Sequence, residues 1–379
     1  MGRFINKGRD LVRASVRSTP TVKRALKRAE DDVEMWRHEL ARRMPSLIKP
    51  RTRKMTVAIT AQCNLRCVGC RYGRDFMPGH QLSLEMVEGL LEDGRAAGVE
   101  TVRLYGGEPL LHKDLPAMVR RGVGLGLRVY VTTNGVLLER KIDELHEAGL
   151  RDITIGYYGT GARYDAYVQR PERYAELQRG VRAVRDRYGD EISLQLNYLV
   201  MRPSRDLDAL ERAWEFALEH DMTFHIDLVH YSLPYFTEGL DHDIQLLPEH
   251  LPEVRAITER LLELKAEHPE RIPESAMSLR SIPDWLEKGP EMDIPCDVYK
   301  MIWVGADGSV KLCYVTFDLG NLHENRLSEI LYTNTHEKAA QDAFALNCPG
   351  CHCERDARIR KDRTSRAIYG AAKRDSRSA

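Results

Sequence analysis

The stretch ITAQCNLRCVGCRYG, from Ile59 to Gly73, decides both the fold and the chemistry of this chain. It begins in an apolar, β-rich run and continues into a loop with three cysteines within eight residues, Cys63, Cys67 and Cys70. The whole chain of 379 residues has only eight cysteines. Thiols clustered directly after a predicted strand indicate a metal site or catalytic groups.

The composition indicates a globular protein of the cytoplasm. Apolar residues make up 42% of the chain and charged residues 30%, which are ordinary proportions for a folded domain. No apolar run reaches the roughly 18 to 20 residues that span a bilayer, and the first residues lack the apolar core of a secretory signal. We therefore expect a cytoplasmic location, where thiols stay reduced and clustered cysteines seldom form disulfides.

Six β-rich runs alternate with helical patterns in the first two thirds of the chain. The runs begin near Met55, Thr101, Arg128, Asp152, Ser193 and Thr223. The helical patterns lie at 83–97, 114–126, 138–149, 171–188 and 205–220. Because parallel neighbours need a crossover helix, the alternation predicts an α/β fold, a partial (β/α)6 barrel of the TIM type. Reactive groups of such folds lie at the carboxyl ends of the strands, and the cysteine loop follows the first strand.

Three thiolates at these short spacings reach three irons of one [4Fe-4S] cluster and leave the fourth iron without a protein ligand. An open iron can bind the amino and carboxylate groups of S-adenosylmethionine and pass an electron to its sulfonium, which releases a 5'-deoxyadenosyl radical. A structural zinc ion is the alternative, but such sites take four ligands and this loop holds no fourth Cys or His. The ligand count favours the cluster.

Two further motifs follow the second and third runs. They are YGGEP, Tyr105 to Pro109, and TTNG, Thr132 to Gly135. Together with the cysteine loop they resemble the radical S-adenosylmethionine superfamily, whose signature follows the first strand of a partial (β/α)6 barrel. The resemblance implies that the cofactor is held by Gly106, Gly107, Glu108, Pro109, Thr133 and Asn134. The glycines permit close backbone approach and the carboxylate suits an ammonium group, whereas TTNG is also compatible with a plain Asn-Gly turn.

One position departs from the family pattern. The family has an aromatic residue directly before the third cysteine, near the adenine, and this chain has Gly69 there. Tyr72 is the nearby aromatic that would compensate.

The other five cysteines lie near the C-terminus. They are Cys296, Cys313, Cys348, Cys351 and Cys353. The first four supply the thiolates of a second, fully ligated [4Fe-4S] cluster, and a structural zinc ion is the alternative. The spacing resembles the twitch domain, the shortened form of the SPASM domain, with one cysteine before a β-hairpin, one after it and a Cys-x2-Cys pair after a helix. Cys353 is left over, as a replacement for Cys351, an idle thiol or a hydrogen donor.

The resemblance implies an oxidoreductase that abstracts hydrogen from a small polar natural product, sugar-like or cyclitol-like, and oxidises it with the second cluster as electron acceptor. Asp227 is the candidate base. A radical epimerase using Cys353, a SPASM-type peptide maturase, and an Fe-S electron carrier or RNA-binding protein are the alternatives. We expect a flavodoxin or ferredoxin as electron donor and no nucleic acid partner. The polar candidates for substrate contact are Tyr157, Tyr158, Asn197, His225, Asp227 and His230.

The predicted organisation has five parts. They are a basic helical extension at 1–50, the radical barrel at 51–240, a helical bridge at 241–290, the cluster domain at 291–356 and a basic tail at 357–379. Residues 1–44 carry twelve Lys and Arg against six Asp and Glu. Apolar residues recur there at helical spacing: Val22, Ala25, Leu26, Ala29, Val33, Trp36 and Leu40. We interpret this as an amphipathic helix packed on the domain with its basic face in solvent, with weak membrane-surface contact as the alternative.

Overall fold

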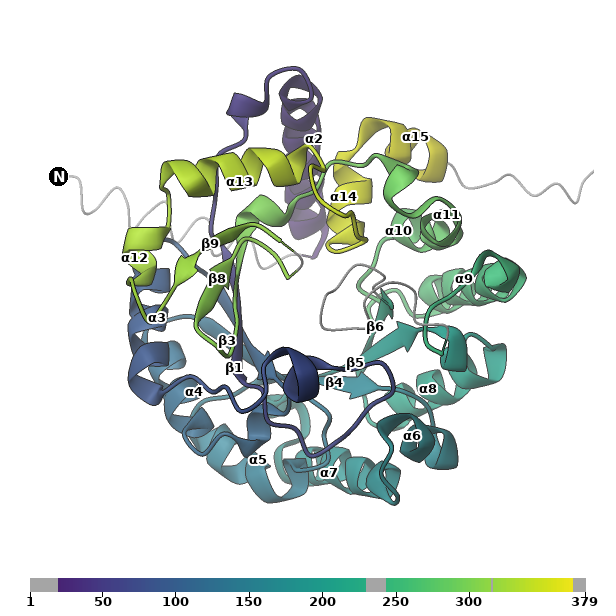
Figure 1. Ribbon diagram of the computed structural model, residues 1–379. Coiled ribbons are helices and arrows are strands. Elements are labelled where there is room, and N and C mark those ends of the chain that lie inside the picture. Colours follow the sequence, from purple (N-terminus) through teal and green to yellow (C-terminus); the bar gives the residue numbers. More distant parts are fainter. Residues whose placement is uncertain (1–19, 230–242, 315, 371–379) are drawn as a thin grey trace, which may run out of the picture.

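The computed structural model describes residues 20–229, 243–314 and 316–370, and its centre is a curved sheet with helices on the outside (Figure 1). Six parallel strands follow the order of the chain. They are β1 Lys54–Thr60, β2 Thr101–Gly106, β3 Arg128–Thr133, β4 Asp152–Tyr157, β5 Ser193–Val200 and β6 Thr223–Leu228. All six predicted strands are confirmed, and the open sheet is a partial barrel.

Five predicted helices are also confirmed on the outer face of the sheet. They are α3 Leu84–Ala96, α4 Leu115–Gly124, α5 Leu138–Glu147, α7 Arg173–Tyr188 and α8 Leu207–Glu219. Side-chain caps fix two of their starts, because Ser83 accepts a hydrogen bond from Met86 N and Asp206 accepts one from Ala209 N. A further helix, α6 Gly161–Val168, was not predicted.

The sheet continues past β1 into the C-terminal part of the chain. Strand β7, Met301–Val304, runs parallel to β1, with Lys54 opposite Met301. Strands β8 Ser309–Lys311 and β9 Asp318–Asn321 then follow antiparallel, which completes one nine-stranded sheet. The segment predicted as a cluster domain is therefore continuous with the barrel sheet.

Alternation along the strands separates an apolar face from a polar one. Residues such as Val102, Leu104 and Leu196 are fully buried under the helices. The intervening residues are half-buried and more polar, and they line the inside of the curve, which we call the lumen. The lumen residues include Arg103, Tyr105, Tyr130, Thr132, Gln195, Asn197, His225 and Asp227.

The remaining helices lie on both sides of the opening of the barrel (Figure 1). They are α9 Leu251–Glu267, α10 Ala276–Arg280, α11 Ile282–Lys288, α12 Leu327–Ile330, α13 Asn334–Phe344, α14 Arg355–Lys361 and α15 Arg363–Gly370. Helices α9 to α11 follow β6, α14 and α15 pack beside α10, and α12 and α13 lie near β9 and α3. Residues 357–370, predicted as part of a basic tail, are thus helical and packed. Their cations have internal partners: Arg358 is buried and donates to Cys351 O at 2.5 Å, and Arg360 pairs with Asp31.

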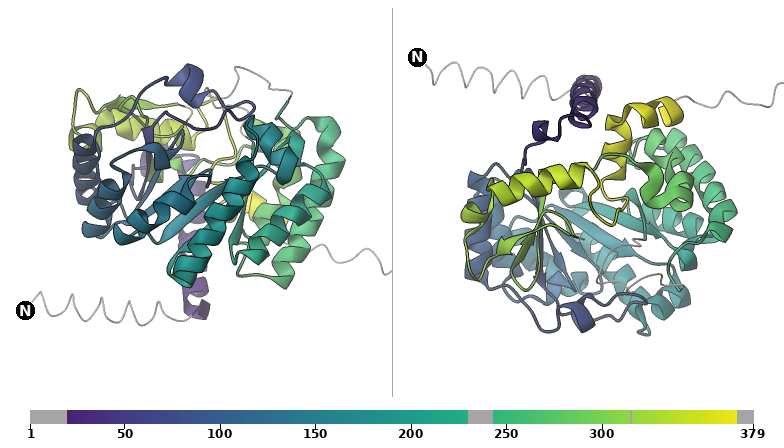
Figure 2. Two further views of the ribbon diagram at one scale, coloured as in Figure 1. Left: turned by 90° about the horizontal axis from the view of Figure 1, so that it is seen from below. Right: turned by 45° about the horizontal axis from the view of Figure 1, so that its top comes forward.

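The N-terminal helix α2, Pro20–Ala41, packs on the domain as expected, but with the opposite face. Its charged side contacts the body, whereas the apolar residues Val33, Trp36 and Leu40 are exposed. Long-range ion pairs decide this orientation, including those of Asp31 with Arg360. Both views of Figure 2 place α2 on the side of the barrel opposite the loop that follows β1. None of the helices in the described ranges is long and apolar enough to cross a membrane.

Candidate active site

The loop with Cys63, Cys67 and Cys70 is held by backbone hydrogen bonds to α6. Arg66 N donates to Val168 O at 3.1 Å, and Val68 N donates to Tyr167 O at 2.9 Å. Gly69 turns the chain with φ of +75°, a conformation that favours glycine and disfavours the aromatic residue of the family pattern. The one departure from that pattern therefore has a backbone reason.

The turn that carries the three thiols is stabilised by hydrogen bonds from Arg74. The Arg74 guanidinium donates to Cys67 O at 3.3 Å and also to Cys70 O, which fixes the turn between these cysteines. Burial raises the pKa of the Cys67 and Cys70 thiols above their ordinary value. Metal binding at this loop must therefore release protons, since the thiolate is the ligand form. Three thiols on one loop fit a [4Fe-4S] cluster with one open iron.

The two glycines of YGGEP lie against the end of β1. Gly107 N donates to Thr60 O at 2.8 Å, and Glu108 N donates to Gln62 O at 2.7 Å. A Cβ atom at Gly107 would lie 2.2 Å from Gln62 O, so no larger residue fits without displacing the start of the cysteine loop. The motif thus sets the position of that loop.

The Glu108 carboxylate joins the second and third strand ends. It is fully buried and accepts hydrogen bonds from Thr133 Oγ1 at 2.7 Å, Asn134 N at 2.8 Å and Leu110 N at 3.0 Å. Burial raises its pKa to about 7, although the three hydrogen bonds act in the opposite direction. Glu108 and Thr133 therefore contact each other, and this buried hydrogen-bond cluster joins the loop after β2 to the loop after β3.

Asn134 connects this hydrogen-bond cluster to the cysteine loop. Its Nδ2 donates to Asn64 Oδ1 at 2.8 Å, one residue after Cys63, and its Oδ1 accepts from Val136 N at 3.1 Å. The TTNG segment is thus both an Asn-Gly turn and a support for the cysteine loop. All the predicted cofactor-binding segments after β1, β2 and β3 lie together.

Two tyrosines have positions that the sequence did not indicate. Tyr72 is buried and its hydroxyl accepts from Ala306 N at 3.3 Å, so its ring packs between the cysteine loop and the turn after β7. Tyr158 packs on Tyr167 with ring centroids 4.8 Å apart, and its phenol interacts electrostatically with all three thiols. Both rings therefore lie close to the cysteine loop, and the adenine contact of Tyr72 stays a prediction.

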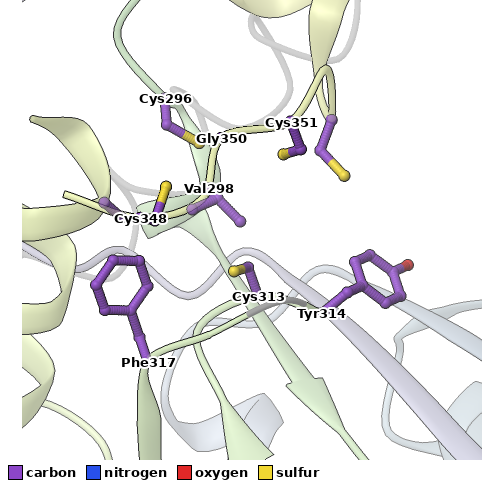
Figure 3. Close-up of a pocket in the computed structure, with 10 residues that line it drawn as sticks. Cys296, Val298, Cys313, Tyr314, Phe317, Cys348, Gly350 and Cys351 are labelled. Carbon is purple, nitrogen blue, oxygen red and sulfur yellow. The ribbon is translucent and has the colours of Figure 1, made fainter. Parts of the chain in front are cut away.

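The five C-terminal cysteines line one pocket together with Val298, Tyr314 and Phe317. Figure 3 shows the sulfur atoms of Cys296, Cys313, Cys348 and Cys351 directed toward a common space. Hairpin β7–β8 precedes Cys313, and α13 precedes Cys348, as the resemblance implies. The Cys353 thiol is hydrogen-bonded to Cys351 and lies at the same pocket.

Four thiols around one pocket supply the ligands of a [4Fe-4S] cluster, and a structural zinc ion takes the same number. A different group in the ranges that the structure describes has all its ligand atoms within 4.8 Å of one another: Glu34, His38 and Asp297. Lys300 lies 2.6 Å from Glu34 and 2.8 Å from Asp297, so that group is an ion-pair network.

Arg103 connects the lumen to the C-terminal pocket. Its Nε donates to Thr132 Oγ1 at 2.9 Å, its Nη1 donates to Tyr314 OH at 3.2 Å, and its guanidinium lies over the Tyr105 ring at 4.7 Å. Tyr314 directly follows Cys313, so the pocket residue reaches into the barrel. Arg103 was not among the predicted site residues, although alternation in the run TVRLYG places it on the same face as Tyr105.

The other end of the lumen carries an acid-base group on β6. His225 pairs with the buried Glu274, and its Nε2 lies 3.8 Å from Asp227 Oδ2. Burial alone would lower the pKa of His225, but the Glu274 carboxylate outweighs it and raises that pKa to about 9. Asn197 lies beside His225 in the sheet, and its Oδ1 is buried without a hydrogen bond in the described part of the chain. Glu274 was not predicted because it follows α9, far from β6 in sequence.

The other polar candidates do not all reach this region. Tyr157 is buried, and its hydroxyl lies 3.5 Å from that of Tyr174, outside the sheet. His230 lies outside the described residues. Asn197, His225 and Asp227 are thus the predicted substrate contacts that the fold brings together.

Comparison with known proteins agrees with this geometry. Residues 57–212 match the family described as the radical SAM superfamily. A GTP 3',8-cyclase of Chlorobaculum tepidum is 32% identical over 173 residues, which cover 44% of this chain and 50% of that protein. A GTP 3',8-cyclase of Marinobacter nauticus is 28% identical over 286 residues, 73% of this chain and 81% of that protein.

Among solved structures, anSMEcpe with bound S-adenosylmethionine and a peptide superposes with a TM-score of 0.59 and 16% identity, over 77% of this chain and 83% of that one. This likeness shows the fold. The chain spans half the length of the Chlorobaculum relative. Residues 57–212 are a radical SAM domain, of a superfamily that uses a [4Fe-4S] cluster and S-adenosylmethionine.

Proposed function

We propose that this chain is a radical enzyme that oxidises a small polar substrate, sugar-like or cyclitol-like, held in the lumen. The observation that carries the proposal is the polar lumen itself. It presents Arg103, Asn197, His225 and Asp227, and it is bordered by the cysteine loop after β1 and by Tyr314 of the C-terminal pocket.

The cofactor side of the site is assigned to the three strand ends. Cys63, Cys67 and Cys70 would hold the first cluster, and Gly106 and Gly107 allow the end of β2 to lie directly against the start of the loop that carries these cysteines. When bound, this cluster and S-adenosylmethionine supply the radical that takes a hydrogen atom from the substrate. Tyr158 provides an aromatic face for the adenine. The loops are positioned by the hydrogen bonds among Glu108, Thr133 and Asn134. One or two lone pairs of the Glu108 carboxylate would remain to accept from the ammonium group of the cofactor.

The C-terminal pocket is assigned to a second [4Fe-4S] cluster, which would supply an electron acceptor. Cys296, Cys313, Cys348 and Cys351 are the proposed ligands, and their sulfurs converge (Figure 3). Arg358 supports this arrangement, since it donates to Cys351 O and lies buried beside the pocket. A flavodoxin or ferredoxin is the proposed reductant.

Proton handling is assigned to β6. His225 is protonated near neutral pH, so it donates a hydrogen bond to an oxygen of the substrate. Asp227, 3.8 Å away, would accept the proton of a hydroxyl as the alcohol carbon is oxidised. Glu274 keeps His225 charged and oriented.

A nucleotide is the second candidate substrate. The relatives named GTP 3',8-cyclase favour it, and the Arg103 guanidinium offers a lumen cation for a phosphate. A radical epimerase with Cys353 as hydrogen donor is a further alternative. The hydrogen bond between Cys353 and Cys351 favours a place with the cluster ligands instead.

The test starts with anaerobically reconstituted protein. We expect about eight irons per chain, falling to about four when Cys63, Cys67 and Cys70 are replaced by alanine. Wild-type protein should cleave S-adenosylmethionine to 5'-deoxyadenosine after reduction, and the double variant Cys296→Ala, Cys313→Ala should keep this cleavage but lose product. About four irons with bound zinc would remove the second cluster, and methyl transfer without 5'-deoxyadenosine would refute the radical chemistry.

Substrate class is tested with a panel of aminocyclitols and sugars, nucleoside triphosphates and short peptides. The readout is substrate-dependent acceleration of 5'-deoxyadenosine formation. We expect the aminocyclitol or sugar group to accelerate it, and His225→Asn to remove the effect without changing the slow cleavage in the absence of substrate. Solvent deuterium at an inverted carbon of the product would replace dehydrogenation by epimerisation.

A further inference from the structure

The helix α2 has two faces with opposite roles. The face toward the protein is charged, and its acidic residues meet cations of the body: Asp31 with Arg360, Asp32 with Arg366, and Glu34 with Lys300. His38 and Ala41 are buried on the same side, and His38 Nε2 lies 3.1 Å from Tyr299 OH. This docking uses polar contacts where helices normally use apolar ones.

The opposite face is an exposed apolar stripe. Its helical members and their exposed fractions are Leu26 45%, Val33 68%, Trp36 57% and Leu40 58%. Spacings of seven, three and four residues place them on one side of the helix. Met44 and Leu47 continue the exposed apolar surface beyond the helix end. Of the twelve large hydrophobic residues that are exposed in the described ranges, six lie between residues 26 and 47, which is a concentration and not the usual scatter.

The free charge around this stripe is positive. Residues 20–28, at the start of α2, contain four Lys and Arg and no acidic residue. Lys27 and Arg28 are exposed, and so is Arg43. The acidic residues at 31, 32 and 34 form ion pairs with the body, and Glu30 is exposed. The N-terminal half of the helix therefore presents apolar side chains together with an excess of cations.

We infer that the α2 stripe docks this protein on an anionic lipid surface. An apolar face with tryptophan and leucine, flanked by lysine and arginine, is the arrangement by which helices lie in the headgroup region of a bilayer. Anionic headgroups attract Lys and Arg side chains that lie near the surface. A second copy of the chain is the competing occupant, and the light-scattering outcome of the test below distinguishes it from a lipid surface.

Docking in this orientation leaves the lumen accessible. Figure 2 places α2 on the side of the barrel opposite the loop after β1, where the cysteines lie. The inference is independent of the proposed reaction.

The tryptophans provide an intrinsic probe. The chain has four, and Trp214, Trp285 and Trp303 are at most 4% exposed, whereas Trp36 is 57% exposed. With the full chain, we expect vesicles of phosphatidylcholine and phosphatidylglycerol to shift Trp36 emission to shorter wavelength and to sediment the protein. Pure phosphatidylcholine vesicles or high salt should weaken both effects. Trp36→Phe should abolish the shift and keep most of the sedimentation.

A pair of matched variants tests the stripe. The double variant Val33→Asp, Leu40→Asp changes exposed residues only, and we expect its vesicle partition coefficient to fall at least tenfold. Leu207→Asp, an exposed leucine on α8, should bind like the wild type. Three results would each overturn the inference: no binding to anionic vesicles, binding unchanged in the double variant, or a dimer by light scattering that the double variant disrupts while vesicles have no effect.

Discussion

Replacing Gly107 by alanine tests whether YGGEP sets the position of the cysteine loop. The new Cβ would lie 2.2 Å from Gln62 O and 2.6 Å from Ala61 O. Carbon and oxygen atoms normally approach to about 3.3 Å, so one loop must move by about 1 Å. Overpacking of this kind costs about 1–3 kcal/mol of folding free energy. A displacement of about 1 Å at a reacting centre lowers rates by up to about 100-fold.

The assays are urea unfolding of the metal-free protein and formation of 5'-deoxyadenosine by the reconstituted protein. Gly89→Ala is the control, because Gly89 lies within α3 and a Cβ there meets nothing within 4 Å. It should gain about 0.5–1 kcal/mol of stability and keep wild-type cleavage. If Gly107→Ala unfolds at the wild-type urea midpoint and cleaves at the wild-type rate, the contact with Gln62 does not position the loop.

Two further predictions concern buried polar groups. The pKa of Glu108, about 7 in the fold, exceeds its ordinary value, so the folded protein retains this proton as the unfolded chain ionises. Stability should therefore fall between about pH 4.5 and 7 by about 3 kcal/mol from this group, and urea titrations of Glu108→Gln should lack that part of the slope; an identical slope would contradict the assignment. Arg103→Met and Tyr314→Phe should each destabilise by about 1–3 kcal/mol, with a coupling of about 1 kcal/mol in the double variant, because they share one hydrogen bond; strictly additive losses would show that this bond contributes nothing.

Local patterns predicted the barrel well. Each of the six strands begins within about one residue of its expected start, since apolar runs and crossover helices are properties of short segments. The first cysteine loop and the two motifs after β2 and β3 were located for the same reason. Helix α6 was missed because it is short and lies within a segment of mixed polarity, although it holds the cysteine loop.

Contacts between distant segments were not predictable in this way. The pairing of β7 with β1, and the insertion of Tyr314 beside Arg103, depend on how the C-terminal part returns to the barrel. The α2 helix shows the same limit. Its spacing indicated an amphipathic helix, but the face that packs was decided by ion pairs with α14 and α15.

The hydrogen bond between Arg103 and Tyr314 affects how variants that lack the proposed second cluster should be interpreted. Cys313 and Tyr314 are neighbours, so a chain that cannot organise the C-terminal pocket also withdraws a phenol from the wall of the lumen. A lower rate of product formation in such a variant would therefore reflect both lost electron transfer and weaker substrate binding. Tyr314→Phe keeps every cysteine and the ring while removing the hydroxyl, so it isolates the contribution of the hydrogen bond to that loss. In the proposed reaction, electron transfer and substrate binding would thereby be coupled through a single side chain.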